Sequence, residues 1–427
     1  MLNHALESPR GGTVRLAIVG SGIAGLACAH LLDPIHDVTL FEADDRLGGH
    51  TNTVTVDDPT AGPLNVDTGF IVHNDRNYPN LLRLFDRLGV QTQDSEMSFS
   101  VSDAESGFTY RATNLATLLA RPANAVDRRL WAMLYDIVRF YRHGRRFLDR
   151  PDPSVTIEQF LEEGNYSKAF VDLHLLPMGA AVWSTGPGDF SRFPAASLLS
   201  FLRNHGLLGV GDRPRWRTVV GGSRTYVDAI AERFSGEILI GCPVDEVSRT
   251  AAGTVRISTR RGDREFDRAI LACHSDQALK LIDRPTPDEQ RLLAAIGYQD
   301  NTAVLHTDTT ILSPARRAWA AWNYHAGPGQ ERASLTYDMT TLQRLPGSKR
   351  YLVTLNPDPD HEPDGVLGRY RYAHPQFTAA AIEAQEQVEC IDGADRLFYC
   401  GAYWGYGFHE DGMNSAIRVC RKLGVRW

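Results

Sequence analysis

A glycine-rich turn near the amino terminus constrains the fold of this chain more than any other feature. The segment VRLAIVGSGIAGLACAHLL, residues 14–32, starts with a short apolar run, breaks at Gly20, Gly22 and Gly25, and continues in the pattern of a helix. An apolar run of this length is typical of a buried parallel strand. The three glycines allow a tight turn, close approach of the backbone to a pyrophosphate, and close packing of the helix on the strand. The segment therefore predicts a Rossmann-like dinucleotide-binding unit.

A second apolar strand, DVTLFE, follows the helix and ends at Glu42. A carboxylate at this separation from the glycines can accept hydrogen bonds from a ribose. The start of the helix offers unpaired N–H groups and a partial positive charge to the phosphates. NAD and FAD both fit this fingerprint.

The residues directly after Glu42 favour FAD. The segment EADDRLGGHTNT supplies Arg46, a second glycine pair at Gly48 and Gly49, and His50. Here the sequence resembles the flavin-containing amine oxidase superfamily, which includes amine oxidases, protoporphyrinogen oxidase and phytoene desaturases. The resemblance implies FAD, a second close approach to its pyrophosphate at this pair, and usually an arginine where this chain has His50.

Two further segments continue the resemblance. In DTGFIVHNDRNYP, residues 67–79, it implies that Gly69 runs beside the flavin ring and that Phe70 faces the substrate. In EILIGCPVDEVSRT it implies that Val244 presents its backbone to the adenine. His73 and Asn74 could face the active site or serve only in a loop.

The carboxyl-terminal stretch YCGAYWGYGFHEDGMNSAI, residues 399–417, is expected to close the site. Gly401 ends the last strand, and a helix is expected to begin at Asp411. Its amino terminus, with the backbone of Gly412 and Met413, would stabilise negative charge at the flavin edge. The family commonly has an acid directly after the strand glycine; this chain has Ala402, so Asp411 is expected to supply that contact.

The same stretch contains the candidates for substrate chemistry. His409 and Glu410 are the best-placed candidates for a general base, although Glu410 could instead only cap the helix. Trp404 and Tyr406 would line the space above the ring, together with Trp183 and Trp322 from elsewhere in the chain.

The expected architecture is an α/β fold in which discontinuous segments form a Rossmann-like FAD-binding domain and the remainder forms an inserted α+β substrate domain. Residues 1–90, 215–285 and 385–427 are assigned to the FAD-binding domain. Residues 91–214, expected to be largely helical, and 286–384, richer in strands, are assigned to the substrate-binding domain.

The segment DRRLWAMLYDIVRFYRHGRRFLDR, residues 127–150, combines apolar residues at helical spacing with many arginines. Such a helix can lie on an anionic lipid surface. It can equally pack in the core with a solvated basic side. We therefore expect a cytoplasmic protein with peripheral contact at the inner membrane face as one outcome.

Composition excludes several other classes. The net charge of −7 argues against general nucleic-acid binding. The six cysteines have no CxxC spacing, and no metal-ligand motif, nucleophile elbow or Walker loop is present, so no metal is expected. The opening MLNHALESPRGGT has no apolar run typical of a secretory signal.

The segments DTGFIVHNDRNYP, PMGAAVWST and GAYWGYGFHEDG resemble a bacterial subgroup often encoded beside methyltransferases of the cyclopropane fatty acid type. This implies dehydrogenation of a methylated or unsaturated acyl chain, which could be attached to phospholipid, and a methyltransferase partner. The alternatives are a flavin amine oxidase, a non-redox flavoprotein isomerase or hydratase, and a non-enzymatic FAD- or lipid-binding partner of a methyltransferase.

Overall fold

The computed structural model describes residues 12–103, 105–183, 190–209, 211, 213–327 and 334–427. Most of the opening segment, and Ser184 and Thr185 of the PMGAAVWST motif, lie outside these described residues.

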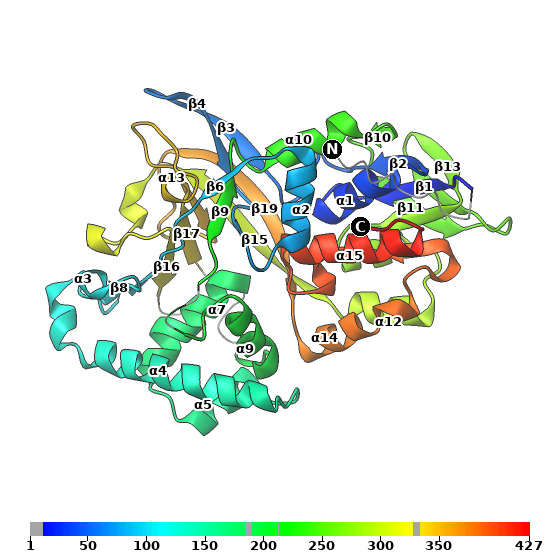
Figure 1. Cartoon of the computed structure of the whole chain (residues 1–427). Helices are drawn as coiled ribbons and strands as arrows, with labels where there is room; N and C mark the ends of the chain where they lie inside the picture. Colours follow the sequence, from blue (N-terminus) through cyan, green and yellow to red (C-terminus); the bar gives the residue numbers. More distant parts are fainter. Residues whose placement is uncertain (1–11, 104, 184–189, 210, 212, 328–333) are drawn as a thin grey trace.

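A five-stranded parallel sheet carries the glycine-rich turn (Figure 1). Its order is β10-β2-β1-β14-β20, and every neighbouring pair is parallel. In chain order this is the 3-2-1-4-5 arrangement of a doubly wound dinucleotide-binding fold, in which ligands bind at the carboxyl ends of the strands. The strands are β1 (Arg15–Val19), β2 (Asp37–Phe41), β10 (Glu237–Leu239), β14 (Arg268–Leu271) and β20 (Leu397–Tyr399).

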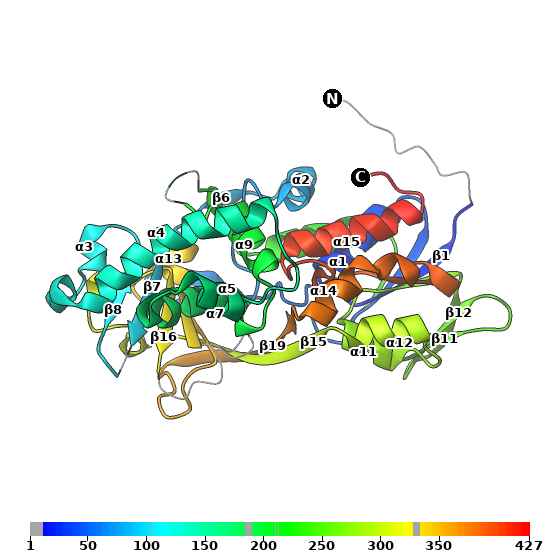
Figure 2. The ribbon, with the colours of Figure 1, turned by 90° about the horizontal axis from the view of Figure 1, so that it is seen from below.

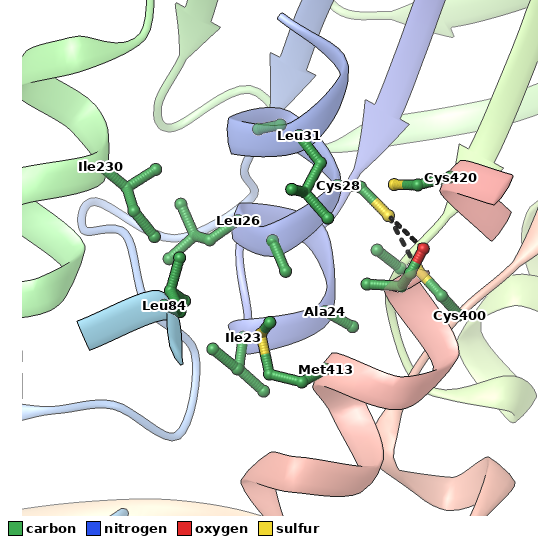
Figure 3. Close-up of a cluster of buried hydrophobic side chains, with 14 of the residues drawn as sticks. Ile23, Ala24, Leu26, Cys28, Leu31, Leu84, Ile230, Cys400, Met413 and Cys420 are labelled. Atoms are coloured by element: carbon green, nitrogen blue, oxygen red, sulfur yellow. Dashed lines mark hydrogen bonds between the residues drawn. The ribbon is translucent and has the colours of Figure 1, made fainter. Parts of the chain in front are cut away.

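Helix α1 (Ile23–Leu32) lies at the centre of one layer over this sheet. All its residues except His30 are buried, as expected for a helix that is apolar on every side. Three helices pack around it: α2 (Pro79–Leu88), α10 (Arg224–Arg233) and α15 (His409–Lys422). Figure 3 shows Met413 of α15 beside Ile23, and the Sγ of Cys28 lies 3.8 Å from the Sγ of Cys400.

The opposite face of the parallel sheet is covered by an antiparallel sheet, β11-β12-β13, and two helices. Apolar residues from both layers, among them Phe41, Ile257 and Leu292, form one buried cluster. These elements are β11 (Val244–Arg249), β12 (Val255–Thr259), β13 (Gly262–Phe266), α11 (Ser275–Leu281) and α12 (Pro287–Ala294).

A seven-stranded sheet, β19-β15-β18-β17-β16-β7-β8, forms the second large sheet (Figure 1). Two of its strands come from the region expected to be largely helical, which begins with strands and becomes helical only after residue 111. The sheet comprises β7 (Phe99–Asp103), β8 (Thr109–Arg111), β15 (Gly297–His306), β16 (Trp322–Ala326), β17 (Ser334–Asp338), β18 (Leu352–Leu355) and β19 (Val366–Gln376). The division of the chain into two domains stays a prediction.

The helices that follow β8 form a separate layer at the end of the molecule opposite β1 (Figures 1 and 2). Their core is rich in aromatic rings, among them Phe140, Phe160 and Phe170. They are α3 (Leu115–Leu118), α4 (Arg128–Asp149), α5 (Ile157–Gly164), α6 (Lys168–Phe170), α7 (Leu176–Trp183) and α9 (Ala195–Asn204), with a π-helical turn at Val171–Leu175. Within the described part of the chain, no helix is both long and apolar enough to cross a membrane.

Smaller elements connect these layers. Two short sheets pair β3 with β4 and β9 with β5 and β6. The remaining strands and α-helices are β3 (Thr53–Asp58), β4 (Gly62–Asp67), β5 (His73–Asn74), β6 (Thr92–Asp94), β9 (Trp216–Val219), α13 (Met339–Leu342) and α14 (Ala379–Glu386).

Candidate functional site

One cavity of about 1710 Å³ connects the glycine-rich turn with the distant helical layer. At one end it is lined by Gly20, Gly22, Glu42 and Val244, and at the other by residues of α3, α4 and α7. This volume exceeds the range of roughly 300–1,000 Å³ usual for small-ligand pockets. The cavity therefore has room for a dinucleotide and a second molecule.

The glycines of the turn bring backbone segments into direct contact. Gly20 has a φ of +104°, and a Cβ there would lie 3.0 Å from the carbonyl oxygen of Ala272. A Cβ on Gly25 would lie only 1.9 Å from the carbonyl oxygen of Gly20, so α1 packs on the turn without room for a side chain. A Cβ on Gly49 would lie 3.2 Å from the Cα of Gly22, which shows that the two glycine motifs are neighbours.

Glu42 is oriented by the backbone of the same turn. One carboxylate oxygen accepts a hydrogen bond from Ser21 N at 2.9 Å and another from the Ser21 hydroxyl. The other oxygen accepts from Asp44 N at 2.8 Å. A carboxylate has about four acceptor positions, so Glu42 keeps capacity for a ribose hydroxyl at the cavity wall.

Arg46 holds the second glycine motif in place. Its guanidinium donates to the carbonyl oxygens of Gly49 at 2.8 Å and Thr51 at 3.3 Å. Gly48 N donates in turn to Ser21 O at 3.1 Å. Arg46, Gly48 and Gly49 all line the cavity.

His50 lies in a cluster of rings at the middle of the cavity. Its ring centroid is 5.1 Å from that of Tyr372, 5.5 Å from His374 and 5.8 Å from His274. Burial lowers the pKa of His50 well below its usual value, and the nearby histidines act in the same direction. Its Nε2 is buried and has no hydrogen-bond partner among the described residues.

Gly69 and Phe70 pass directly beside this histidine. A Cβ on Gly69 would lie 2.1 Å from the carbonyl oxygen of His50, and Phe70 N donates to that oxygen at 2.8 Å. The Phe70 ring stacks on the ring of His409, with centroids 3.6 Å apart. Phe70 and His409 both line the cavity, so the first residue of α15 meets the DTGF segment there.

His409 is held by two hydroxyl groups. Its Nε2 lies 2.9 Å from Thr51 Oγ1 and 3.2 Å from the hydroxyl of Tyr226. Burial lowers its pKa to about 3, and the neighbouring His73 acts in the same direction. His409 is therefore neutral at physiological pH. Neither His73 nor Asn74 lines the cavity.

Glu410 is directed away from the cavity, which corrects its assignment as a candidate base. One oxygen accepts from Asn80 N at 3.0 Å and the other from Leu81 N at 2.9 Å. These N–H groups belong to the first turn of α2, where the backbone donors have no partner within the helix. Glu410 therefore caps α2, and not the helix that carries it.

The helix expected to begin at Asp411 begins at His409. The N–H of Gly412 consequently donates to Phe408 O at 3.1 Å, and Met413 is fully buried against α1. Neither residue lines the cavity, so their assignment as backbone donors to the cofactor is wrong. Asp411 accepts from Phe408 N at 2.9 Å and also lies outside the cavity lining.

The aromatic residues assigned to the substrate space separate into two groups. Trp183, Trp322 and Tyr406 line the cavity. Trp404 does not: it packs near Tyr403, and the guanidinium of Arg418 lies 5.8 Å from its ring centroid. A short 3₁₀ turn, Ala402–Trp404, directs this ring away from the cavity.

Val244 and Gly401, which were assigned from the sequence, line the cavity. Several other residues of the site were not indicated by the sequence. Tyr372 and His374 reach the cavity from β19, a strand that the sequence had not indicated. Thr51 and Tyr226 position His409 from other segments. No local sequence pattern indicates such contacts, although the position of Thr51 two residues after Gly49 was a usable signal.

The site and the fold agree with the comparisons to known proteins. The model of the flavin containing amine oxidoreductase family matches residues 23–423, and this chain belongs to that family. It is 24% identical over 339 residues to an L-amino-acid oxidase from Crotalus adamanteus, covering 73% of this chain and 60% of the relative. It is 26% identical over 310 residues to a putative flavin-containing monoamine oxidase from Mycobacterium tuberculosis, covering 69% and 64%. This chain spans less than two thirds of the length of these curated relatives.

The structural comparison supports the same fold. A crystal structure of a CLA-producing fatty acid isomerase from P. acnes superposes with a TM-score of 0.66 at 17% identity, covering 96% of this chain and 98% of that one. The chain therefore has the amine-oxidase-like α/β fold. Its membership of the flavin containing family identifies FAD as its cofactor.

The residues of the nucleotide end fit this cofactor. No side chain caps the start of α1, so its first N–H groups are available to a phosphate. The glycine contacts leave backbone instead of side chains at this wall, and Glu42 faces it as a ribose acceptor. Gly20, Gly22, Glu42, Gly49 and Val244 would hold the dinucleotide.

Proposed function

We propose that this protein is an FAD-dependent oxidoreductase that dehydrogenates a methylated or unsaturated fatty acyl chain. The observation that carries the proposal is the part of the cavity lined by the helical layer, which we call the apolar arm. Its lining includes Leu118, Leu134, Ile137, Met178, Val182 and Phe201. An apolar arm of this kind favours a long hydrocarbon substrate over a small polar one.

FAD, when bound, supplies the hydride acceptor for such a dehydrogenation. The apolar arm orients the acyl chain and excludes water from the reacting carbon atoms. A proton leaves most substrates in this reaction class, and His409 is the residue that we assign to accept it. Its pKa of about 3 leaves the imidazole neutral, with one unprotonated nitrogen that is a weak base, so the assignment rests on its position in the cavity lining. Thr51 and Tyr226 hold the ring in position.

The proposal is tested by anaerobic titration of the FAD-loaded protein with methylated and unsaturated acyl lipids. Bleaching of the flavin absorbance by an acyl lipid, with a new double bond found by mass spectrometry, is expected. Val182→Trp, which fills part of the apolar arm, should abolish this bleaching and leave the FAD content unchanged. Absence of bleaching with every acyl lipid would refute the proposal.

An amine oxidase is the first alternative. A neutral amine needs an aromatic cage, for which the aromatic residues near positions 404 and 322 are the candidates. Trp322 and Tyr406 line the cavity and Trp404 does not, so a cage there would have to be formed without Trp404. Peroxide production with a panel of amines would favour this alternative.

Two further alternatives predict different outcomes. Conversion of an acyl lipid without any electron acceptor would indicate a non-redox isomerase or hydratase. Co-purification with a methyltransferase, without flavin reduction by any substrate, would indicate a non-enzymatic partner. Association with a methyltransferase stays a prediction of the resemblance.

A further inference from the structure

Helix α4 carries apolar side chains on its exposed face. Trp131, Tyr135 and Val138 are 51%, 68% and 44% exposed. Their spacing of four and three residues places them in one stripe along the helix. The inward face is formed by a different set, which includes Leu130, Met133 and Phe140. The helix is therefore apolar on two sides, and only one of them is covered by this chain.

Two further exposed apolar side chains lie in the segments that precede α4 in the chain. Leu115 at the start of α3 is 63% exposed and Val126, directly before α4, is 84% exposed. Of the nine large apolar or aromatic side chains that are exposed among the described residues, five lie between residues 115 and 138. We call these five residues the α4 patch: Leu115, Val126, Trp131, Tyr135 and Val138. Clustered exposure of this kind marks an interaction surface.

The central ring of the patch is fixed in its exposed position. The indole N–H of Trp131 donates to the carbonyl oxygen of Ala125 at 3.0 Å. Its polar group is thus satisfied while the ring faces outward. Tryptophan and tyrosine are the residues that concentrate at membrane–water interfaces, because each joins a large apolar ring to one polar group.

Arginines flank the patch along the same helix. The exposed side chains of Arg128, Arg142 and Arg146 make no hydrogen bond or ion pair with another described residue. The acid within this part of α4, Asp136, is buried and accepts hydrogen bonds from Ser167 N and Arg139. Between Arg128 and Arg146, helix α4 therefore presents positive charge with no exposed carboxylate of its own.

The cavity opens beside the patch. Leu115 and Val138 line the cavity and are also exposed to solvent. The cavity therefore reaches the molecular surface at α3 and α4, at the end of the molecule opposite β1 (Figures 1 and 2). A molecule that enters the apolar arm from this side passes the α4 patch first.

We propose that the α4 patch docks on an anionic phospholipid bilayer and admits an acyl chain from it into the cavity. The entry of an acyl chain into the cavity rests on the proposed function. The charge of the patch identifies its partner as an anionic bilayer. Apolar rings between unpaired arginines complement a surface with an apolar interior and anionic head groups. A two-fold dimer through the same patch would place arginines from both copies in one interface, where like charges repel.

The proposal is tested by co-sedimentation of the FAD-loaded full chain with vesicles of phosphatidylcholine, with and without phosphatidylglycerol. Binding that increases with phosphatidylglycerol and decreases with salt is expected. The variant Trp131→Gln/Tyr135→Gln should lower binding by on the order of tenfold or more. Its matched control is Val366→Gln/Leu367→Gln, which removes exposed apolar side chains from β19 at the opposite edge of the seven-stranded sheet from β8. The control should bind normally.

The charge contribution has its own variant. Arg128→Gln/Arg142→Gln/Arg146→Gln is expected to lower binding to anionic vesicles by on the order of 100-fold, because each arginine near such a surface contributes about 1 kcal/mol and about 1.4 kcal/mol is a factor of ten. The control Arg260→Gln/Arg421→Gln/Arg426→Gln removes the same charge from exposed positions outside the patch. Equal binding by both triple variants would overturn the assignment of the arginines to the docking surface.

Absence of binding to anionic vesicles overturns the proposal. A concentration-dependent dimer that is lost in Trp131→Gln/Tyr135→Gln would also overturn the proposal, because the patch would then bind a second copy of this chain. Bleaching by detergent-dispersed lipid without vesicle binding would overturn the docking surface and leave the proposed function intact. Vesicle binding without bleaching by any lipid would refute the proposed function and leave the docking surface intact.

Discussion

The Nε2 of His409 lies 2.9 Å from the Oγ1 of Thr51, although 358 residues separate them in the chain. Thr51 lies two residues after Gly49 of the second glycine motif, and His409 is the first residue of α15. This contact joins the carboxyl-terminal segment to the nucleotide-binding end of the cavity. The position of the His409 ring therefore depends on both ends of the chain.

Removal of the His409 imidazole is expected to lower kcat by roughly 10²- to 10⁴-fold, the usual contribution of a general base. Thr51→Val should lower kcat less, by about tenfold, because the Tyr226 hydroxyl still lies 3.2 Å from Nε2. Both variants should retain FAD, measured by absorbance. Thr55→Val is the control, because its hydroxyl bonds to Asn65 at an exposed position. Full activity in His409→Ala would contradict the assignment.

The glycines of the first motif should respond differently to substitution. Gly25→Ala is expected to prevent folding or lower Tm strongly, because the new Cβ would lie 1.9 Å from Gly20 O. Gly22→Ala meets no atom within 4 Å and has a φ of −63°, so it should fold normally and bind FAD at least about tenfold more weakly. Gly297→Ala, also without a neighbour within 4 Å, controls for the added methyl group. Unchanged FAD affinity in Gly22→Ala would contradict a role in cofactor contact.

Loss of the Glu410 side chain should affect stability and not chemistry. Glu410→Ala removes the carboxylate that caps α2 and is expected to lower the free energy of unfolding by about 1–2 kcal/mol. Glu410→Gln keeps one acceptor oxygen and should lose less. Urea unfolding and kcat are the measurements. A fall in kcat with unchanged stability would restore Glu410 as a candidate base.

Asp411 should make stability depend on pH. Burial raises its pKa from 3.8 to about 7. Because the folded state holds this proton more tightly than the unfolded state, the stability that it contributes is present below about pH 4 and is lost as the pH rises through 7. Asp411→Asn has no proton to lose, so its stability relative to the native chain should increase from pH 5 to pH 8, by on the order of 1 kcal/mol or more.

The control for this measurement is Asp152→Asn. Hydrogen bonds from Ser154 lower the pKa of Asp152 below 3.8, so its titration lies below the tested range. The stability difference of this variant should be the same at pH 5 and pH 8. An Asp411→Asn difference that is also constant would show that the carboxyl group of Asp411 titrates normally.

The pattern of the nucleotide end was readable from the sequence because it is local. Short apolar strands, glycines and a helix follow one another in residues 14–42, and the structure has β1, α1 and β2 there. The end of helix α2 is also local, because Gly89 follows its last residue with the left-handed φ of +74° that favours glycine. The resemblance to the flavin-containing family starts from the same short motifs, and the family model matches residues 23–423.

Other parts of the site were not readable, because they depend on pairing between distant segments. The helix expected at Asp411 starts at His409, and this earlier start places Gly412 and Met413 inside the helix. Glu410 then contacts the start of α2, and no local sequence pattern indicates this contact. Trp404 turns away from the cavity for a comparable reason: a 3₁₀ turn before α15 sets the direction of its ring.

The sequence by itself determined the dinucleotide-binding unit, because the glycines and the apolar strands act through their own backbone and nearest neighbours. Only the tertiary structure decided which side chains meet in the cavity. Strand β19 brings Tyr372 and His374 to His50, and packing against the helical layer selects which apolar face of α4 is covered and which stays exposed. Both outcomes depend on the relative placement of segments hundreds of residues apart, which periodicity within one segment does not encode.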